Sequence, residues 1–149
     1  SAEDVDGGIQ ITGSHNPANY NGFKMVFQGR PFFGADILKI GEMAAAGDWD
    51  DGSGTHEKRD VVDAYIDALM KPFDGLSAGE MEKLSSLRIG WDAGNGAAGP
   101  CLERLVARLP GEHFTLFTEV DGNFPNHHPD PTEEKNLADL KALVAKRLG

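Results

Sequence analysis

The sequence has little cysteine, little positive charge and no long apolar run, and each shortage excludes a class of protein. A single cysteine, Cys101, permits no internal disulfide, which predicts a protein of the reducing cytoplasm. No stretch approaches the run of about 18 apolar residues that a membrane helix requires. Lysine and arginine number 14 against 24 aspartate and glutamate residues, so the net charge is −10. Nucleic acids and anionic membranes attract basic surfaces, so neither is expected as a partner.

Apolar residues make up 40% of the chain, which is enough for a folded core. Their spacing alternates between the periods of strands and of helices. Strands are predicted at residues 8–12, 23–27, 87–91 and 114–118, a turn at 28–31, helices at 35–46, 58–70, 97–109 and 133–148, and a proline-rich loop at 121–132. This order predicts an α/β fold with mixed-sheet βαβ-type layers and a parallel sheet in its second half.

The pattern also predicts a division of the chain. We expect residues 1–50 to form the C-terminal part of a first domain, residues 51–57 a linker, and residues 58–149 a second, α/β domain. The first strand has no preceding partner, and the last helix stops where a further strand is expected. Both features predict a fragment of a longer α/β protein.

The Thr-Gly-Ser-His-Asn-Pro run of residues 12–17 follows the end of the first predicted strand. A phosphate-carrying serine needs an exposed hydroxyl on a constrained turn, with a cation or proton donor nearby. Ser14 fits this need, because Pro17 stiffens the loop and Lys24 follows it. An Asn21-Gly22 turn is expected to fold the chain back and return Lys24 to Ser14. An ordinary surface turn with an exposed lysine is the competing interpretation.

Three segments resemble one known family. The Ile-Thr-Gly-Ser-His-Asn-Pro run of residues 11–17, followed by Tyr-Asn-Gly-Phe-Lys at residues 20–24, resembles the catalytic loop of the α-D-phosphohexomutases, in particular of bacterial phosphomannomutase/phosphoglucomutase. Residues 92–96 and 119–131 resemble two stretches of the second domain of these enzymes. The segments occur in the order of the family, and the likeness covers nearly the whole chain.

The resemblance implies an intramolecular phosphotransferase of four domains. Such an enzyme interconverts hexose 1-phosphate and 6-phosphate, of mannose or glucose, through a phosphoserine and a bisphosphorylated sugar. Ser14 carries the phosphoryl group and offers one of its oxygens to Mg²⁺, and Lys24 moves a proton or contacts phosphate. His15 is counted with this pair as a catalytic residue that orients the loop. Loop support is implied for Asn16, Thr12 and Asn21.

The resemblance also implies what these residues lack. The metal loop of the family, the sugar-recognition loop of the third domain and the phosphate-binding loop of the fourth are absent. We therefore expect the isolated chain to be inactive, and to depend on domains 3 and 4, on Mg²⁺ and on glucose or mannose 1,6-bisphosphate as activator. Phosphoglucosamine mutase stays open as an alternative, because the loop that selects the sugar lies outside the chain.

A second function class competes with the mutase. The glycines at 94, 96 and 99 match the G-x-G-x-x-G pattern of dinucleotide-binding domains, and Glu119 stands where an acidic residue is expected. We favour a simpler role, in which the glycines permit a tight turn and close packing of a helix on a strand.

Two further interpretations concern the same half of the chain. A transition-metal site at His127, His128 and Asp130 is disfavoured, because consecutive side chains diverge and a structural site needs four converging ligands. A folded, non-catalytic fragment is the third class. Exposed apolar surface on such a fragment predicts self-association.

Overall fold

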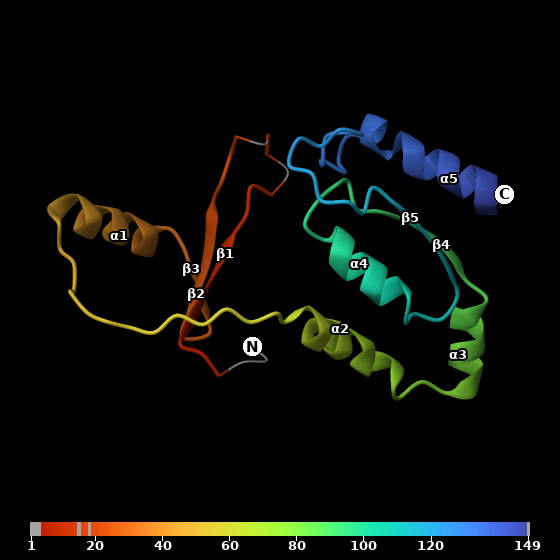
Figure 1. The fold of residues 1–149 in the computed structure, drawn as a ribbon, viewed down its shortest axis with the longest axis horizontal. Coiled ribbons are helices and arrows are strands. Elements are labelled where there is room, and N and C mark those ends of the chain that lie inside the picture. The colour runs from red at the N-terminus through yellow and green to blue at the C-terminus, as the bar shows by residue number, and fades with distance from the viewer. Residues whose placement is uncertain (1–3, 15, 18, 149) are drawn as a thin grey trace. The chain divides into compact units, whose positions relative to one another are not determined.

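The computed structural model describes residues 4–14, 16–17 and 19–148, which fall into two compact units (Figure 1). Unit 1 comprises residues 1–14 and 19–58, and unit 2 comprises residues 15–18 and 59–149. Each unit contains its own sheet. No helix within the described ranges is both long and apolar enough to cross a bilayer.

Unit 1 is an antiparallel sheet of three strands followed by one helix. β1 (Gly7–Ile11) pairs with β2 (Phe23–Phe27), and β2 pairs with β3 (Arg30–Phe32). α1 (Ala35–Ala46) follows, and Gly47 caps its C-terminus. The bounds predicted for the second strand and the first helix are confirmed.

The β2–β3 connection is tighter than the sequence predicts. Gln28 and Gly29 have φ values of 48° and 73°, as a two-residue hairpin turn requires. Arg30 therefore already pairs with Phe27, and Pro31 with Val26. The predicted turn over residues 28–31 is wrong in its second half, because a proline is compatible with an edge strand.

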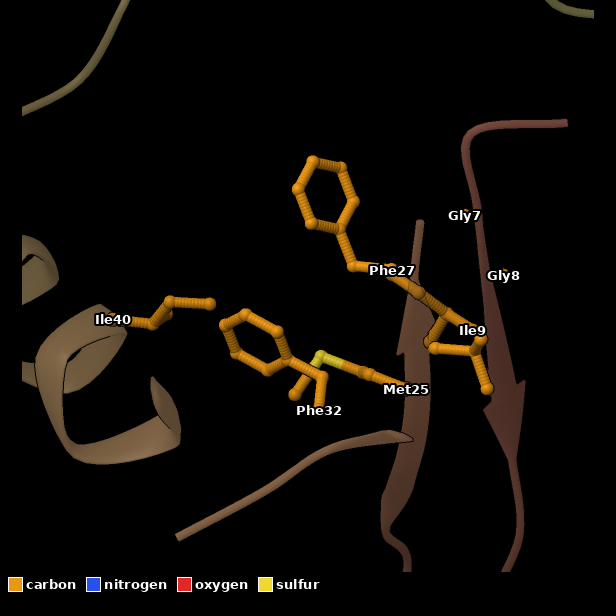
Figure 2. A pocket seen from close by; sticks show the side chains of 8 residues that line it. Gly7, Gly8, Ile9, Met25, Phe27, Phe32 and Ile40 are labelled. Atoms are coloured by element: carbon orange, nitrogen blue, oxygen red, sulfur yellow. The ribbon is translucent and has the colours of Figure 1, made fainter. Parts of the chain in front are cut away.

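Apolar side chains of unit 1 remain in contact with solvent, and none of its described residues is buried. The sheet and α1 leave an apolar groove of about 380 Å³, into which Met25, Phe32 and Ile40 point (Figure 2). No titratable side chain lines this groove among the described residues. It therefore offers nothing that would bind a charged sugar phosphate.

Unit 2 contains a parallel pair of strands, and Figure 1 shows α5 along one side of the pair and α4 along the other. Its elements are α2 (Val62–Met70), η1 (Lys71–Phe73), α3 (Ala78–Ser85), β4 (Arg88–Asp92), α4 (Gly99–Val106), β5 (Glu112–Leu116), η2 (Glu134–Leu137) and α5 (Ala138–Leu148). The predicted parallel sheet is confirmed.

Several predicted bounds in unit 2 are wrong by a few residues, for local reasons. α2 begins at Val62, because Asp60 Oδ1 accepts the Val62 N–H at 3.0 Å. α4 begins at Gly99, since Pro100 has no N–H and suits only a first turn. β5 ends at Leu116, because Phe117 adopts a φ of 52°. The predicted closing helix divides into η2 and α5.

Packing in unit 2 buries a small core. Ile66 of α2 is only 1% exposed, although Val61 and Tyr65 of the same predicted helix are both 54% exposed. α5 packs on β4 at Gly90, where an added Cβ would lie 3.2 Å from Leu140. α3 was not predicted from the apolar pattern.

α3 owes its start to polar contacts. The Ser77 side chain accepts the Glu80 N–H, while the Glu80 carboxylate accepts the Ser77 N–H at 2.8 Å. This reciprocal capping box closes the first turn. The Ser77 hydroxyl and backbone hydrogen bonds also lower the pKa of Glu80. A capping box stabilises a helix start independently of an apolar stripe, which explains why periodicity did not predict α3.

Candidate active site

The loop between β1 and β2 carries the candidate phosphoserine. The antiparallel ladder continues one pair beyond β1, where the Thr12 N–H donates to the Gly22 carbonyl at 2.9 Å. Thr12 Oγ1 then accepts the Ser14 N–H at 2.9 Å. Ser14 is exposed and has a φ of 54°. A left-handed backbone at a residue other than glycine costs about 1–3 kcal/mol, and such strain concentrates at functional sites.

The two sides of this loop approach each other closely. A Cβ on Gly13 would lie 3.0 Å from the Tyr20 carbonyl oxygen. A larger residue before Ser14 would therefore push the loop open. The absence of a side chain at Gly13 lets the loop present Ser14 at the end of the hairpin.

Lys24 lies at the start of β2, on the sheet face that Thr12 shares. It pairs with Gln10, and residues two apart along a strand point to one face. Thr12 is therefore a diagonal neighbour of Lys24, at a separation of about 7–8 Å in typical sheets. Lys24 is exposed. The hairpin register thus places Lys24 and Thr12, which holds Ser14, at the same end of one face of the sheet. That Lys24 lies close to Ser14 itself stays a prediction.

The chain does not reverse at Asn21-Gly22. Neither residue is among the described residues with positive φ, as a tight Asn-Gly turn needs. Gly22 instead continues the ladder with Thr12. Asn16 is exposed, and His15 lies outside the described residues.

The described residues do not supply a complete metal site. Within the described ranges, no three His, Cys, Asp or Glu side chains are grouped so that they could hold a metal ion. The His127 ring bonds to Asp92, while Asp130 Oδ1 accepts the Thr132 hydroxyl at 2.7 Å. Mg²⁺ takes several fixed oxygen ligands. A phosphoryl group on Ser14 would supply only part of that ligand set.

The glycine turn after β4 is filled by the chain itself. A Cβ on Gly99 would overlap the Thr118 carbonyl, and one on Gly94 would lie 3.4 Å from His127 Cε1. Asn95 Nδ2 donates to the Glu119 backbone carbonyl at 2.9 Å. The glycines therefore allow α4 and the 121–132 loop to pack on the strand ends, as the simpler interpretation predicts. His127 and Pro129 of the same loop lie against Gly94.

Asp92 and His127 form a largely buried pair that the sequence did not predict. His127 Nε2 lies 2.9 Å from Asp92 Oδ2, and the two side chains are 15% and 8% exposed. Burial by itself lowers the pKa of His127, but hydrogen bonds to the His128 carbonyl and to Asp92, with the negative charges of Asp92 and Asp139, raise it above 6.5 overall. The available clue was that Asp92 stands at the carboxyl end of a parallel strand.

The two units match two domains of one known family. A sequence model described as phosphoglucomutase/phosphomannomutase, alpha/beta/alpha domain I matches residues 1–51, and the corresponding domain II matches residues 63–148. The chain belongs to the phosphoglucomutase/phosphomannomutase family. The resemblance stated from the motifs and the α/β fold class are thereby confirmed.

Curated relatives and solved structures agree with this membership. A phosphomannomutase/phosphoglucomutase of Pseudomonas putida is 39% identical over 137 residues, which is 92% of this chain and 28% of that protein. A phosphoglucomutase of Neisseria gonorrhoeae is 41% identical over 144 residues, with the same two coverages. A family protein of Burkholderia thailandensis has a TM-score of 0.82 at 41% identity, covering 95% of this chain and 29% of that one. The chain thus spans only about 28% of the length of its curated relatives.

Proposed function

We propose that this chain is the phosphoserine-bearing part of a phosphohexomutase, an intramolecular phosphotransferase that interconverts hexose 1-phosphate and 6-phosphate. The observation that carries the proposal is the backbone of Ser14, which is left-handed, exposed and held by Thr12 at the end of the β1–β2 hairpin. The names of the relatives, phosphomannomutase/phosphoglucomutase and phosphoglucomutase, support this activity.

The proposed reaction moves one phosphoryl group away from Ser14 and another back. A free hydroxyl of the hexose phosphate attacks phosphorus, the new P–O bond forms, and the bond between phosphorus and Ser14 Oγ breaks. The product is a bisphosphorylated sugar and an unmodified serine. After the sugar reorients, Ser14 Oγ attacks its other phosphoryl group, which restores the phosphoserine and releases the isomer.

Lys24 has two proposed roles in this scheme, and both require its ammonium group to lie close to Ser14. Its ammonium group offsets the charge of nearly −2 that a phosphoserine carries. The same ammonium group provides the proton that Ser14 Oγ takes up as it leaves phosphorus, and it regains a proton from the attacking hydroxyl. His15 and Asn16, on the same loop, orient Ser14, while Thr12 and Asn21 support the two sides of the loop.

Other parts of the site are proposed to come from outside these residues. Mg²⁺ would accept a phosphoryl oxygen on Ser14 and take its remaining ligands from elsewhere in a longer protein, and it would neutralise charge during transfer. We place the sugar-recognition and distal phosphate loops in third and fourth domains, and glucose or mannose 1,6-bisphosphate as the activator that primes Ser14. The single cysteine favours a cytoplasmic location.

Glucose and mannose phosphates are the proposed substrates, because both names occur among the relatives. Glucosamine phosphate is the alternative, and a direct comparison of the three sugars would decide between them. We also propose that the apolar surface of unit 1 promotes self-association when the chain is isolated. Light scattering that shows a monomer at high concentration would contradict that point.

Turnover measurements test the proposed division of labour. The full-length protein that carries these residues should convert mannose or glucose 1-phosphate with Mg²⁺, and residues 1–149 alone should not. Ser14→Ala should remove turnover, and Lys24→Met should lower it strongly while circular dichroism remains unchanged. Measurable conversion by residues 1–149 alone would show that the site is complete without further domains.

A further inference from the structure

The dipeptide Asn-Gly occurs twice in the sequence, at Asn21-Gly22 and at Asn95-Gly96. Asn-Gly is the sequence most prone to spontaneous deamidation, because glycine leaves its backbone nitrogen open to reach the asparagine amide. The reaction needs a mobile backbone and an accessible side chain. Asn21 is exposed and Asn95 is buried. The same chain therefore contains both a test site and its control.

Asn21-Gly22 lies in the exposed loop that carries Ser14. Asn21 is exposed. The hydrogen bond found for the Gly22 N–H within the described residues goes to Asn21 Oδ1 at 3.2 Å. The nitrogen that would attack therefore already lies beside the amide group that it would attack. Loops of this kind open at low free-energy cost.

Asn95-Gly96 is locked in place. Asn95 is 5% exposed. Its Nδ2 donates to the Glu119 carbonyl at 2.9 Å, and its Oδ1 accepts from Asn126 Nδ2 at 2.8 Å. The Gly96 N–H donates to the Ala93 carbonyl at 2.9 Å, so it is turned away from the Asn95 side chain. Attack would require unit 2 to open first.

We infer that Asn21 is a site of spontaneous deamidation in the folded protein, and that the fold protects Asn95 from the same reaction. The Gly22 nitrogen loses its proton to solvent base and attacks Asn21 Cγ. The N–Cγ bond forms, the Cγ–Nδ2 bond breaks, and the amide nitrogen leaves as ammonia with a proton from water. Water then opens the cyclic imide at either carbonyl, which gives aspartate or isoaspartate and needs no oxidant.

The product changes the loop in two ways. It adds one negative charge to the loop that holds Ser14, and isoaspartate lengthens the backbone next to the Thr12–Gly22 pair. The consequence for phosphoryl transfer rests on the proposed function. A new carboxylate on the loop that holds Ser14 should disfavour the approach of phosphate dianions, so deamidated protein should accept phosphate on Ser14 more slowly.

Peptide mapping tests the modification without any activity assay. The folded chain is incubated at mildly alkaline pH, with a parallel sample in concentrated urea. Trypsin releases residues 1–24 and 89–104, which separate the two dipeptides, and fragment ions assign the mass gain to a residue. Asn95 should convert at least about tenfold more slowly than Asn21 in the folded chain, because it requires opening. In urea both should convert at similar rates.

A matched variant and a second readout complete the test. Gly22→Ala should slow conversion at Asn21 and leave Asn95 unchanged. An Asn21 that stays intact in the folded chain, or an Asn95 that converts as fast, would overturn the inference. Anion exchange then separates the deamidated full-length protein. Lower phosphate uptake at Ser14 in that fraction supports the proposed consequence, and equal uptake contradicts it. If neither fraction takes up phosphate at Ser14, the result counts against the proposed function and not against the deamidation.

Discussion

Units 1 and 2 differ in how far their side chains are buried and in which candidate site residues they contain. Unit 1 holds the candidate phosphoserine and its lysine, yet none of its described residues is buried. Unit 2 buries Ile66, Asn95 and Asn136, and the Asn95 side chain bonds to the chain that follows β5. Local hydrogen bonds therefore position the exposed loop in unit 1, whereas buried side chains and hydrogen bonds between residues distant in sequence hold unit 2 together.

The largest expected difference between the units is the stability lost when a cavity is made in the core of unit 2. Ile66→Ala should lower the free energy of unfolding of unit 2 by about 2–5 kcal/mol, the usual cost of truncating a buried isoleucine. Ile37→Ala in α1 is the matched control, since Ile37 is 41% exposed, and it should cost much less. Urea denaturation followed by circular dichroism measures both variants, and Trp91 fluorescence follows unit 2. Equal losses would contradict the contrast between the units.

Glycine substitutions give a second, smaller contrast. Gly99→Ala should destabilise unit 2 by about 1–3 kcal/mol, a typical cost of overpacking, because the new Cβ would overlap the Thr118 carbonyl. Gly41→Ala in the middle of α1 has nothing within 4 Å of the added Cβ and should stabilise the helix by about 1 kcal/mol. Thermal unfolding of the two variants should therefore shift in opposite directions. A stable Gly99→Ala protein would mean that α4 does not pack this closely.

A third and smaller effect depends on pH and concerns unit 2 alone. The pKa of His127 is raised above 6.5 in the folded chain, so its charged form is favoured by folding. This contribution is complete below pH 6.5 and is lost as the pH rises through the higher folded value. Wild type should thus exceed His127→Gln in stability most at acid pH. Denaturation curves at several pH values measure the difference, and one that stays constant with pH would exclude this titration.

The sequence predicted the elements that an apolar pattern or a glycine stop marks. The β2 strand and α1 matched their predicted bounds, because alternation and a glycine C-cap determine them. α3 escaped prediction because it has no clear apolar stripe, although the Ser77 and Glu80 capping box at its start is a local signal that could have found it. The β1–β2 register, which aligns Lys24 with Gln10, was not readable from the Asn-Gly pair that was expected to set it.

The Asp92–His127 pair escaped prediction for another reason. Its members are separated by 35 positions, and only the parallel strands and the return of the 121–132 loop bring them together. The motif around Ser14, by contrast, is contiguous, so its family could be identified from residues alone. Long-range contacts of this kind depend on the tertiary fold, which local patterns do not encode.

The intact mass of the full-length protein before and after exposure to glucose 1,6-bisphosphate tests the central claim most directly. We expect a mass gain of one phosphoryl group, located by peptide mapping on Ser14 and absent from Ser14→Ala. A gain of the same size that persists in Ser14→Ala would contradict the account, because another residue would then carry the phosphate.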